Sequence, residues 1–232
     1  MEFTKSLIKG KLIKRYKRFF VDVKIDKKTV TAHCPNTGSM KGLLDQDNDV
    51  YLLKHDDPKR KLKYGLEIIK AQNNLVGVNT HLANKIVNHG LSNNLINELK
   101  NSDEIKAEVF FNKETRFDFL IKKNKQKIFL EVKNVTLFRN KNTAEFPDAI
   151  TSRGSKHLLA LIDAIKKGYK AYLLFLVQIE NMENFKIAND IDSEYYKNYL
   201  AAKKAGVNFL AYRCKISSKE IFIEKKLKII NE

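Results

Sequence analysis

The feature that most constrains the fold is a pair of strand-like runs separated by a short charged segment. Residues 116–121 and 127–135 are rich in apolar and β-branched side chains, and residues 122–127 between them are mostly charged. This pattern predicts two antiparallel strands joined by a hairpin. A loop of two or four residues centred between positions 124 and 125 sets Asp118 directly opposite Glu131. Residues in direct opposition have Cβ atoms about 5 Å apart.

The predicted hairpin brings two carboxylates and one ammonium group together. Glu131 and Lys133 lie two residues apart on one strand, so they share a face, while Leu130 and Val132 face the other way. Two neighbouring carboxylates repel each other unless a cation or a proton lies between them. Mg²⁺, or Mn²⁺ in its place, is the natural cation for oxygen ligands.

An Asp followed a dozen residues later by Glu-x-Lys matches the core of the PD-(D/E)xK nuclease pattern. In this interpretation Asp118 and Glu131 hold the metal ion, and Lys133 favours hydroxide or neutralises charge on the phosphorane. Glu108, on the preceding predicted strand, completes the acidic group, and Phe117 stands where the pattern has proline. The alternative is a solvated face of an ordinary amphipathic hairpin, where this spacing also arises by chance.

A second group of polar residues lies at the predicted start of a helix. Arg153, Lys156 and His157 are spaced i, i+3 and i+4 and therefore share one helical face. Beside a helix N-terminus, two cations and an imidazole form a site suited to an anion such as phosphate. An exposed surface cluster is the alternative interpretation.

The formal charge of +17, from 44 basic and 27 acidic residues, favours a polyanionic partner such as nucleic acid. A biased composition is the alternative, because 37 of the 44 basic residues are Lys. Residues 1–28 interleave basic and aromatic side chains, as strands that contact phosphates and stack on bases do. The same aromatics also fit the core of an amphipathic strand.

We predict that nucleic acid is contacted by Lys14, Arg15, Lys17, Arg18, Thr37, Ser39, Lys41, Arg116, Arg153, Lys156 and His157. For the loop at 36–41, a structured turn without nucleic-acid contact is the alternative.

The chain divides into an all-β part and an α/β part, which we place at residues 1–80 and 81–232. The first part has predicted strands at 12–25, 28–33, 50–55, 62–71 and 75–79. Five short strands favour a small barrel of the OB type, with an open sheet as the alternative. Residues 81–101 are predicted to be helical with a break near Gly90. Beyond residue 105 the sequence predicts a mixed sheet with strands at 105–111, 116–121, 127–135, 170–178, 208–214 and 220–224. Helices are predicted from Thr151 or Ser152 to Gly168, and over about 193–205.

Several function classes are disfavoured. Cys34 and Cys214 are the only cysteines and form no paired motif, which favours a reduced, cytoplasmic protein over a disulfide scaffold. The N-terminus lacks an apolar signal core, and the longest apolar run, at 171–177, is too short to span a bilayer, so we expect no membrane partner. His33 and Cys34 are adjacent and make a poor zinc chelate. The sequence leaves the oligomeric state open.

Several ordered strings resemble the sugar fermentation stimulation protein A family along nearly the whole chain. They are His33-Cys34-Pro35-Asn36-Thr37-Gly38-Ser39-Met40, Val76-Gly77-Val78-Asn79-Thr80, Arg116-Phe117-Asp118-Phe119, Glu131-Val132-Lys133-Asn134-Val135-Thr136-Leu137, Phe146-Pro147-Asp148-Ala149 and Arg153-Gly154-Ser155-Lys156-His157-Leu158. The resemblance implies an OB-like domain followed by a PD-(D/E)xK nuclease-like domain. It also implies DNA binding with little sequence preference and a link to expression of sugar-utilisation genes, maltose among them. Ser152 stands where relatives often carry Glu, and Asp47-Asn48 where they usually carry Pro-Gly.

Three functions therefore stay open from the sequence. The first is a DNA-binding protein, on single or double strands, whose nuclease-like domain only binds. The second is a Mg²⁺-dependent nuclease acting through Asp118, Glu131 and Lys133. The third is an RNA-binding protein, because a basic OB-like barrel fits RNA as well as single-stranded DNA.

Overall fold

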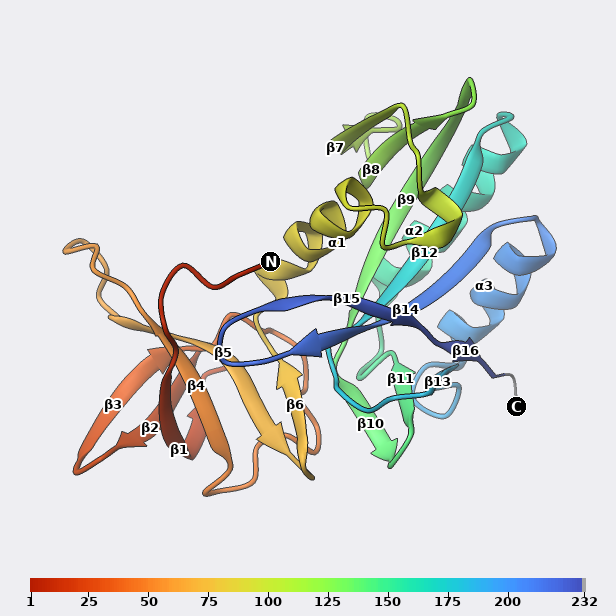
Figure 1. Cartoon of the computed structure of the whole chain (residues 1–232). Coiled ribbons are helices and arrows are strands. Elements are labelled where there is room, and N and C mark those ends of the chain that lie inside the picture. Colours follow the sequence, from red (N-terminus) through yellow and green to blue (C-terminus); the bar gives the residue numbers. More distant parts are fainter. Residues whose placement is uncertain (231–232) are drawn as a thin grey trace.

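The protein is described by a computed structural model that covers residues 1–230. Two sheet systems lie side by side, a β-barrel at the N-terminal end and an α/β unit after it (Figure 1). The barrel strands are β1 (Ile8–Tyr16), β2 (Phe20–Ile25), β3 (Lys28–His33), β4 (Asp49–Lys54), β5 (Tyr64–Ala71) and β6 (Asn74–Gly77). Their order is β3-β2-β1-β4-β5-β6, and β3 also pairs with β5. That pairing, of His33 with Gly65, closes β1–β5 into a five-stranded barrel and confirms the predicted OB-like fold.

The single strand predicted over residues 12–25 is wrong. It is a hairpin of β1 and β2, whose last pair is Tyr16 and Phe20. Lys17 and Arg18, between the strands, have positive φ angles of 47° and 61°. The sequence has no Gly or Asn at this turn to reveal it, and Lys and Arg are unusual residues in this conformation.

The connection between the two units is a 3₁₀ turn, η1 (Thr80–Leu82), followed by helix α1 (Ala83–Ser92) and a second turn, η2 (Asn97–Leu99). The helical segment is interrupted as predicted, but at residues 93–96 rather than at Gly90, which lies inside α1. A Cβ atom at position 90 would lie 2.7 Å from Ile223 Cδ1, so glycine allows close packing of the helix on β15 rather than breaking it.

The α/β unit is built on a six-stranded sheet that is mixed, as predicted, and its strand order is β15-β14-β12-β9-β8-β7. Its strands are β7 (Glu104–Phe110), β8 (Arg116–Lys123), β9 (Gln126–Val135), β12 (Lys170–Val177), β14 (Asn208–Ile216) and β15 (Ile221–Lys226). Helix α2 (Ser152–Lys166) packs on β9 and β12 and against α3 (Ser193–Lys204), whereas α1 packs on β9 and β15. Gly168, with a φ of 84°, follows the end of α2 as a C-cap glycine does.

The sequence did not reveal a second, four-stranded sheet of order β10-β11-β13-β16. Its strands are β10 (Leu137–Asn140), β11 (Thr143–Phe146), β13 (Asn184–Ile187) and β16 (Lys228–Ile229). None exceeds four residues, so their alternation is too short to recognise, and two of the four, β13 and β16, join the sheet only through tertiary packing.

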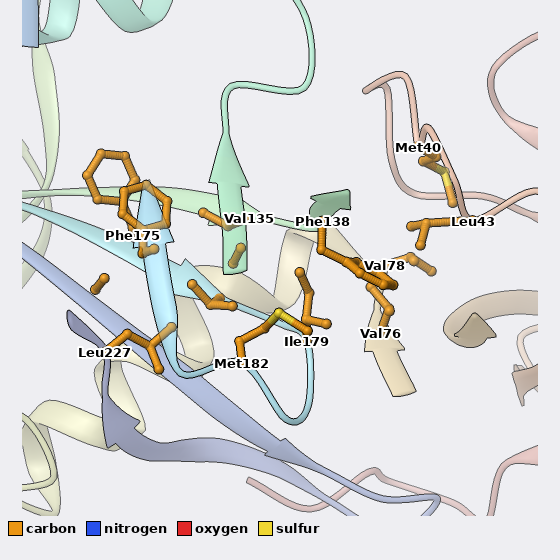
Figure 2. Packing of buried hydrophobic residues seen from close by; sticks show 14 of the residues in the cluster. Met40, Leu43, Val76, Val78, Val135, Phe138, Phe175, Ile179, Met182 and Leu227 are labelled. Atoms are coloured by element: carbon orange, nitrogen blue, oxygen red, sulfur yellow. The ribbon is translucent and has the colours of Figure 1, made fainter. Parts of the chain in front are cut away.

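The barrel and the α/β unit share a hydrophobic core (Figure 2). Val76 and Val78 from the barrel side belong to the same buried cluster as Phe138 and Ile179. Backbone hydrogen bonds cross the junction as well, from Gly77 N to Gln178 O and from Glu180 N to Leu75 O, at 2.9 and 3.1 Å. No helix within residues 1–230 has both the length and the apolar character needed to cross a membrane.

Candidate active site

The hairpin of β8 and β9 has the register expected from the sequence. Phe119 pairs with Leu130, and the ladder continues to Lys123 opposite Gln126. Asn124 and Lys125 form a two-residue loop with φ angles of 49° and 64°, which is the conformation of a type I′ hairpin turn. The shorter of the two predicted loops is therefore the observed one.

Glu131 is the buried centre of the candidate site, with a side chain only 3 % exposed. Lys133 Nζ donates to Glu131 Oε1 at 2.7 Å, so these two residues share a face as predicted. His157 Nδ1 of α2 contacts the same carboxylate oxygen. Leu130 and Val132 point to the other face and pack in the cluster that contains α1.

Asp118 lies where β8 and β9 separate. The pairing of β8 with β9 ends at Phe119, and Val132 N donates instead to Asp118 Oδ2 at 2.7 Å. The regular alternation of β8 also breaks there, because Phe117 packs with the α2 side and Phe119 with the α1 side. The Asp118 side chain therefore lies between the two separating strands, and Asp118 does not form a direct cross-strand pair with Glu131.

Asn84 of α1 links Asp118 to Glu108. Its Nδ2 donates to Asp118 Oδ1 at 2.7 Å and to Glu108 Oε1 at 3.2 Å. Glu108 lies on β7 between residues that pair with Phe117 and Phe119, and Arg116 Nε reaches its Oε2 at 2.9 Å. Sequence reasoning missed Asn84, since only the packing of α1 on the sheet brings it near the acidic residues.

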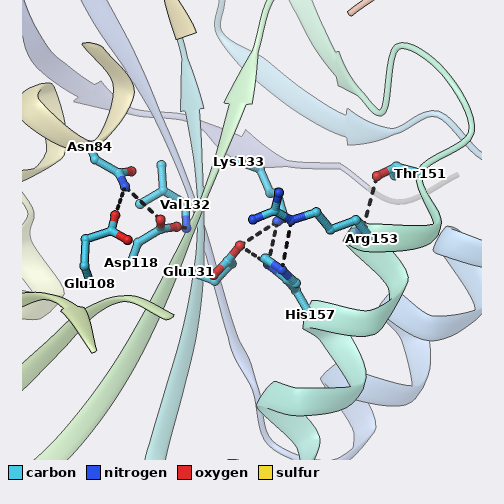
Figure 3. Close-up of polar contacts among 10 residues, drawn as sticks. Asn84, Glu108, Asp118, Glu131, Val132, Lys133, Thr151, Arg153 and His157 are labelled. Atoms are coloured by element: carbon cyan, nitrogen blue, oxygen red, sulfur yellow. Dashed lines mark hydrogen bonds and ion pairs between the residues drawn. The ribbon is translucent and has the colours of Figure 1, made fainter. Parts of the chain in front are cut away.

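Glu131 with its partners Lys133 and His157, and Asp118 with Glu108, line one cleft of about 920 Å³ (Figure 3). Predicted catalytic, metal and nucleic-acid residues make up most of its wall, which consists of Glu108, Glu114, Thr115, Arg116, Asp118, Glu131, Val132, Lys133, Arg153, Lys156, His157 and Leu159. The tertiary structure thus gathers four carboxylates and a basic rim from β7, the loop after it, β8, β9 and α2.

The two central carboxylates have different electrostatic environments. Burial, together with the nearby charge of Glu131, raises the pKa of Asp118 to about 6, against the effect of the Val132 and Asn84 hydrogen bonds. Burial also acts to raise the pKa of Glu131, but the hydrogen bonds and charges of His157 and Lys133 outweigh it and hold that pKa below its ordinary value. Glu131 is consequently ionised over a pH range in which Asp118 still binds a proton.

The donor set suits a divalent metal ion in part. Glu131 Oε2 is buried and has no hydrogen-bond partner, and Asp118 supplies a second carboxylate on the cleft wall. Within residues 1–230, however, no three His, Cys, Asp or Glu side chains are already arranged around a common metal position. A metal ion at Asp118 and Glu131 therefore needs water, backbone or substrate oxygens to complete its coordination.

The first turns of α2 place Arg153, Lys156 and His157 on the wall of the cleft. Thr151 caps the helix, with its side-chain oxygen accepting from Gly154 N at 3.1 Å. Arg153 Nε donates to His157 Nε2 at 3.5 Å, and the other ring nitrogen, Nδ1, contacts Glu131. Lys156 is exposed on the rim. Ser152 is also exposed and supplies no carboxylate.

The barrel residues expected to contact nucleic acid are divided between exposed and internally bonded positions. Lys14, Lys17, Arg18, Thr37 and Lys41 are exposed. A groove of about 570 Å³, which Arg18 and Thr37 help to line, continues along residues 146–151 to the start of α2.

Arg15 and Ser39 make contacts within the protein. The Arg15 guanidinium donates to Asn36 O at 2.7 Å and to Gly38 O at 3.0 Å, which holds the loop at 36–41 in shape. Ser39 N and Oγ donate to Asp148 Oδ2 at 2.9 and 3.1 Å. The loop is thus a structured turn that joins the barrel to residues 146–151, and a direct nucleic-acid contact by Arg15 or Ser39 stays a prediction.

Comparison with known proteins agrees with both halves of this architecture. Residues 13–78 match the SfsA N-terminal OB domain, and residues 81–220 match the Sugar fermentation stimulation protein RE domain. A sugar fermentation stimulation protein homolog of Pelagibacter ubique is 78% identical over 231 residues, covering 100% of both chains. A homolog of the same name from Maricaulis maris is 40% identical and covers 99% of this chain and 98% of its own. The solved structure of Pyrococcus furiosus SfsA in complex with Ca²⁺ covers 100% of this chain and 98% of its own, with a TM-score of 0.88 and 25% identity. The chain therefore belongs to the sugar fermentation stimulation protein family.

Proposed function

We propose that this protein binds DNA with little sequence preference and hydrolyses phosphodiester bonds, with a divalent metal ion, in the cleft of Asp118, Glu131 and Lys133. The observation that carries the proposal is the buried, unpartnered Glu131 Oε2 inside a cleft with a basic rim. Acidic groups that face a polyanion weaken its binding unless a cation shields them. A site built only for binding gains nothing from them.

Asp118 and Glu131 are the residues that would hold the metal ion, Mg²⁺ or Mn²⁺, and Glu108 would join them if Asn84 released it. The Ca²⁺ bound by the Pyrococcus relative supports a divalent ion in this family. When bound, such an ion polarises a phosphoryl oxygen and acidifies water.

The chain's own residues then bind and orient the substrate. Lys133 Nζ, 2.7 Å from Glu131 Oε1, supplies a positive charge where negative charge develops on the reacting phosphate. His157 holds the Glu131 carboxylate in position. Arg116, Arg153 and Lys156 on the rim would contact backbone phosphates, which carry no sequence information and so give little sequence preference.

DNA binding without hydrolysis is the second candidate function, and a specific observation favours it. Glu131 Oε1 already has two partners, Lys133 and His157, and Ser152 adds no acidic ligand. The name of the relatives, sugar fermentation stimulation protein homolog, supports a link to sugar fermentation in either case.

The deciding experiment compares Glu131→Gln with the wild-type protein on matched single-stranded DNA, duplex DNA and RNA. With Mg²⁺ or Mn²⁺ we expect wild-type cleavage that EDTA stops, no cleavage by Glu131→Gln, and DNA binding that is retained or strengthened in the variant. Preference for RNA in the competition assay would instead support an RNA-binding protein.

Glu114→Gln is the matched control, since Glu114 lines the same cleft and its replacement by Gln removes the same single negative charge. It should keep cleavage near the wild-type rate. Cleavage that persists in Glu131→Gln would show that the activity arises elsewhere, and no cleavage by the wild type under any metal would leave binding alone as the function.

A further inference from the structure

A second pocket, of about 380 Å³, lies between the barrel and the start of α1 and shares no lining residue with the cleft. Its wall is formed by the ends of β3 and β4, the start of β5, residues 79–85 and the N-terminal segment 1–4. In Figure 1 this N-terminal segment runs from the barrel toward α1. The volume falls in the range of small-molecule sites.

The pocket gathers more basic side chains than acidic ones, since its wall holds five of the former and two of the latter, the exposed Glu2 and the buried Glu67. Five of its lining residues carry a guanidinium, ammonium or imidazole group, namely His33, His55, Arg60, His81 and Lys85. Within residues 1–230, no group forms a hydrogen bond or ion pair with the side-chain nitrogens of these five. Burial and the charge of Arg60 lower the pKa of both His33 and His55. An anion in the pocket would relieve this repulsion.

The one buried acid in the pocket is suited to donate rather than to repel. Glu67 is 4% exposed, and Asn79 Nδ2 donates to its Oε2 at 2.8 Å. Burial raises its pKa to about 7, which leaves a large share of the group protonated near neutral pH. A protonated carboxyl has an O–H that can donate to a phosphate oxygen.

Gly65 forms the floor that brings two of these groups together. A Cβ atom at this position would lie 3.0 Å from His55 Nε2 and 3.6 Å from Glu67 Oε1. His55 Nε2 and Glu67 Oε1 therefore both lie close to Gly65, and a side chain at this position would fill the space between them.

A metal ion fits this pocket poorly. Three histidines and a glutamate are metal-ligating types, but within residues 1–230 no three such side chains are arranged to share one ion. Arg60 and Lys85 beside them would also repel a cation. The apolar part of the wall, Phe3, Pro35, Leu53 and Leu82, instead suits a flat organic group next to the anion.

We propose that this pocket binds a phosphomonoester attached to a planar base, that is, a nucleoside monophosphate or the 5′-phosphorylated end of a strand. Arg60, Lys85 and the imidazoles hold the phosphate, Glu67 donates to it, and Phe3 with Leu82 contacts the base. The site is independent of hydrolysis in the cleft.

The test is isothermal titration of the full-length protein at pH 7 with AMP, adenosine and inorganic phosphate. AMP should bind more tightly than either of the others, because only AMP fills both parts of the pocket. Arg60→Gln and Lys85→Gln should each weaken AMP binding by about tenfold, the loss expected for one charge-assisted contact. Lys59→Gln, which removes the same charge one residue away and outside the pocket wall, should leave it unchanged.

Displacement of AMP by a short oligonucleotide with a 5′-phosphate, but not by its 5′-hydroxyl counterpart, would identify strand ends as the ligand. Displacement by neither would identify the free nucleotide. The proposal is overturned if AMP does not bind, if adenosine binds as well as AMP, or if Arg60→Gln and Lys85→Gln bind AMP like the wild type. Unchanged AMP binding by Glu131→Gln separates this outcome from that of the cleavage assay.

Discussion

At the scale of single residues, the cleft separates two carboxylates by their environments. Glu131 receives donors from Lys133 and His157 and is stabilised as an anion. Asp118 has neutral donors, Val132 N and the Asn84 amide, and burial dominates its titration. Pairs of acidic groups whose pKa values are driven apart are typical of catalytic sites.

The raised pKa of Asp118 predicts a pH-dependent stability difference for Asp118→Asn. The folded pKa of about 6 lies above the ordinary 3.8, so the contribution of Asp118 to stability is fully present below pH 3.8 and is lost as the pH rises to 6. Asn does not titrate and keeps an oxygen for Val132 N. In EDTA, the free energy of unfolding of Asp118→Asn, relative to that of the wild type, should therefore be higher at pH 7 than at pH 4, by at most about 3 kcal/mol. Urea denaturation at both pH values measures this, and an equal difference at both would contradict the burial of a charged Asp118.

At the scale of secondary-structure elements, the site depends on how one hairpin turns and how one helix begins. The two-residue turn at Asn124 and Lys125 sets the register of β8 against β9. The capped start of α2 sets where Arg153 and His157 point. Each device is local, and each can be tested without altering a residue of the cleft.

Lys125→Gly should stabilise the protein by about 0.5 kcal/mol. Lys125 has a φ of 64°, which costs a residue with a side chain more than it costs glycine, and Asn-Gly is the favoured pair for this turn. The greater freedom of glycine in the unfolded chain offsets part of the gain. Chemical denaturation checks the sign, and Lys127→Gly on β9 is the control, expected to destabilise because it lies in a strand.

Thr151→Ala should cost about 1 kcal/mol of unfolding free energy, since it removes the oxygen that caps Gly154 N. Thr151→Ser keeps the hydroxyl and should stay close to the wild type. The two variants are compared by thermal and urea unfolding; equal losses in both would mean that the methyl group, not the cap, carries the effect.

At the scale of the whole molecule, the barrel and the α/β unit are joined by a shared core, and the chain as a whole carries a large positive net charge. The shared core around Val76, Val78, Phe138 and Ile179 and the backbone bonds at Gly77 join the units (Figure 2). Deletion of the barrel would expose this core, so point substitutions on the barrel surface test its contribution to binding more cleanly than truncation.

The charge of +17 predicts DNA affinity that falls steeply with salt. If six or more phosphates are contacted, raising the salt from 50 to 200 mM should weaken binding by about a thousandfold. Replacing both Lys17 and Arg18 by Gln should lower the log–log salt slope by about one for each lost phosphate contact. Fluorescence anisotropy measures both effects, with Lys215 and Lys219 replaced by Gln as the control of equal charge. A salt-independent affinity would contradict binding through phosphates.

The local order of residues was enough to predict the barrel, the mixed sheet, the two-residue option for the β8–β9 turn and the shared face of Glu131 and Lys133. These features follow from strand alternation, turn positions and short-range spacing, which any segment carries within itself. The hairpin at Lys17 and Arg18 was missed because its turn has no Gly or Asn, and the four strands of the second sheet because each is too short to show alternation. The place of Gly90 inside α1 depends on its packing against Ile223, which is distant in sequence.

The candidate site shows the same division. Residue types and spacing were sufficient to select Asp118, Glu131, Lys133, Arg153 and His157. Only the folded chain brought Asn84 of α1 between Asp118 and Glu108, turned His157 onto Glu131 and left one oxygen of Glu131 without a partner. Hydrogen bonding and burial depend on the atoms that surround a group in space, and those atoms come from helices and strands that the local sequence does not specify.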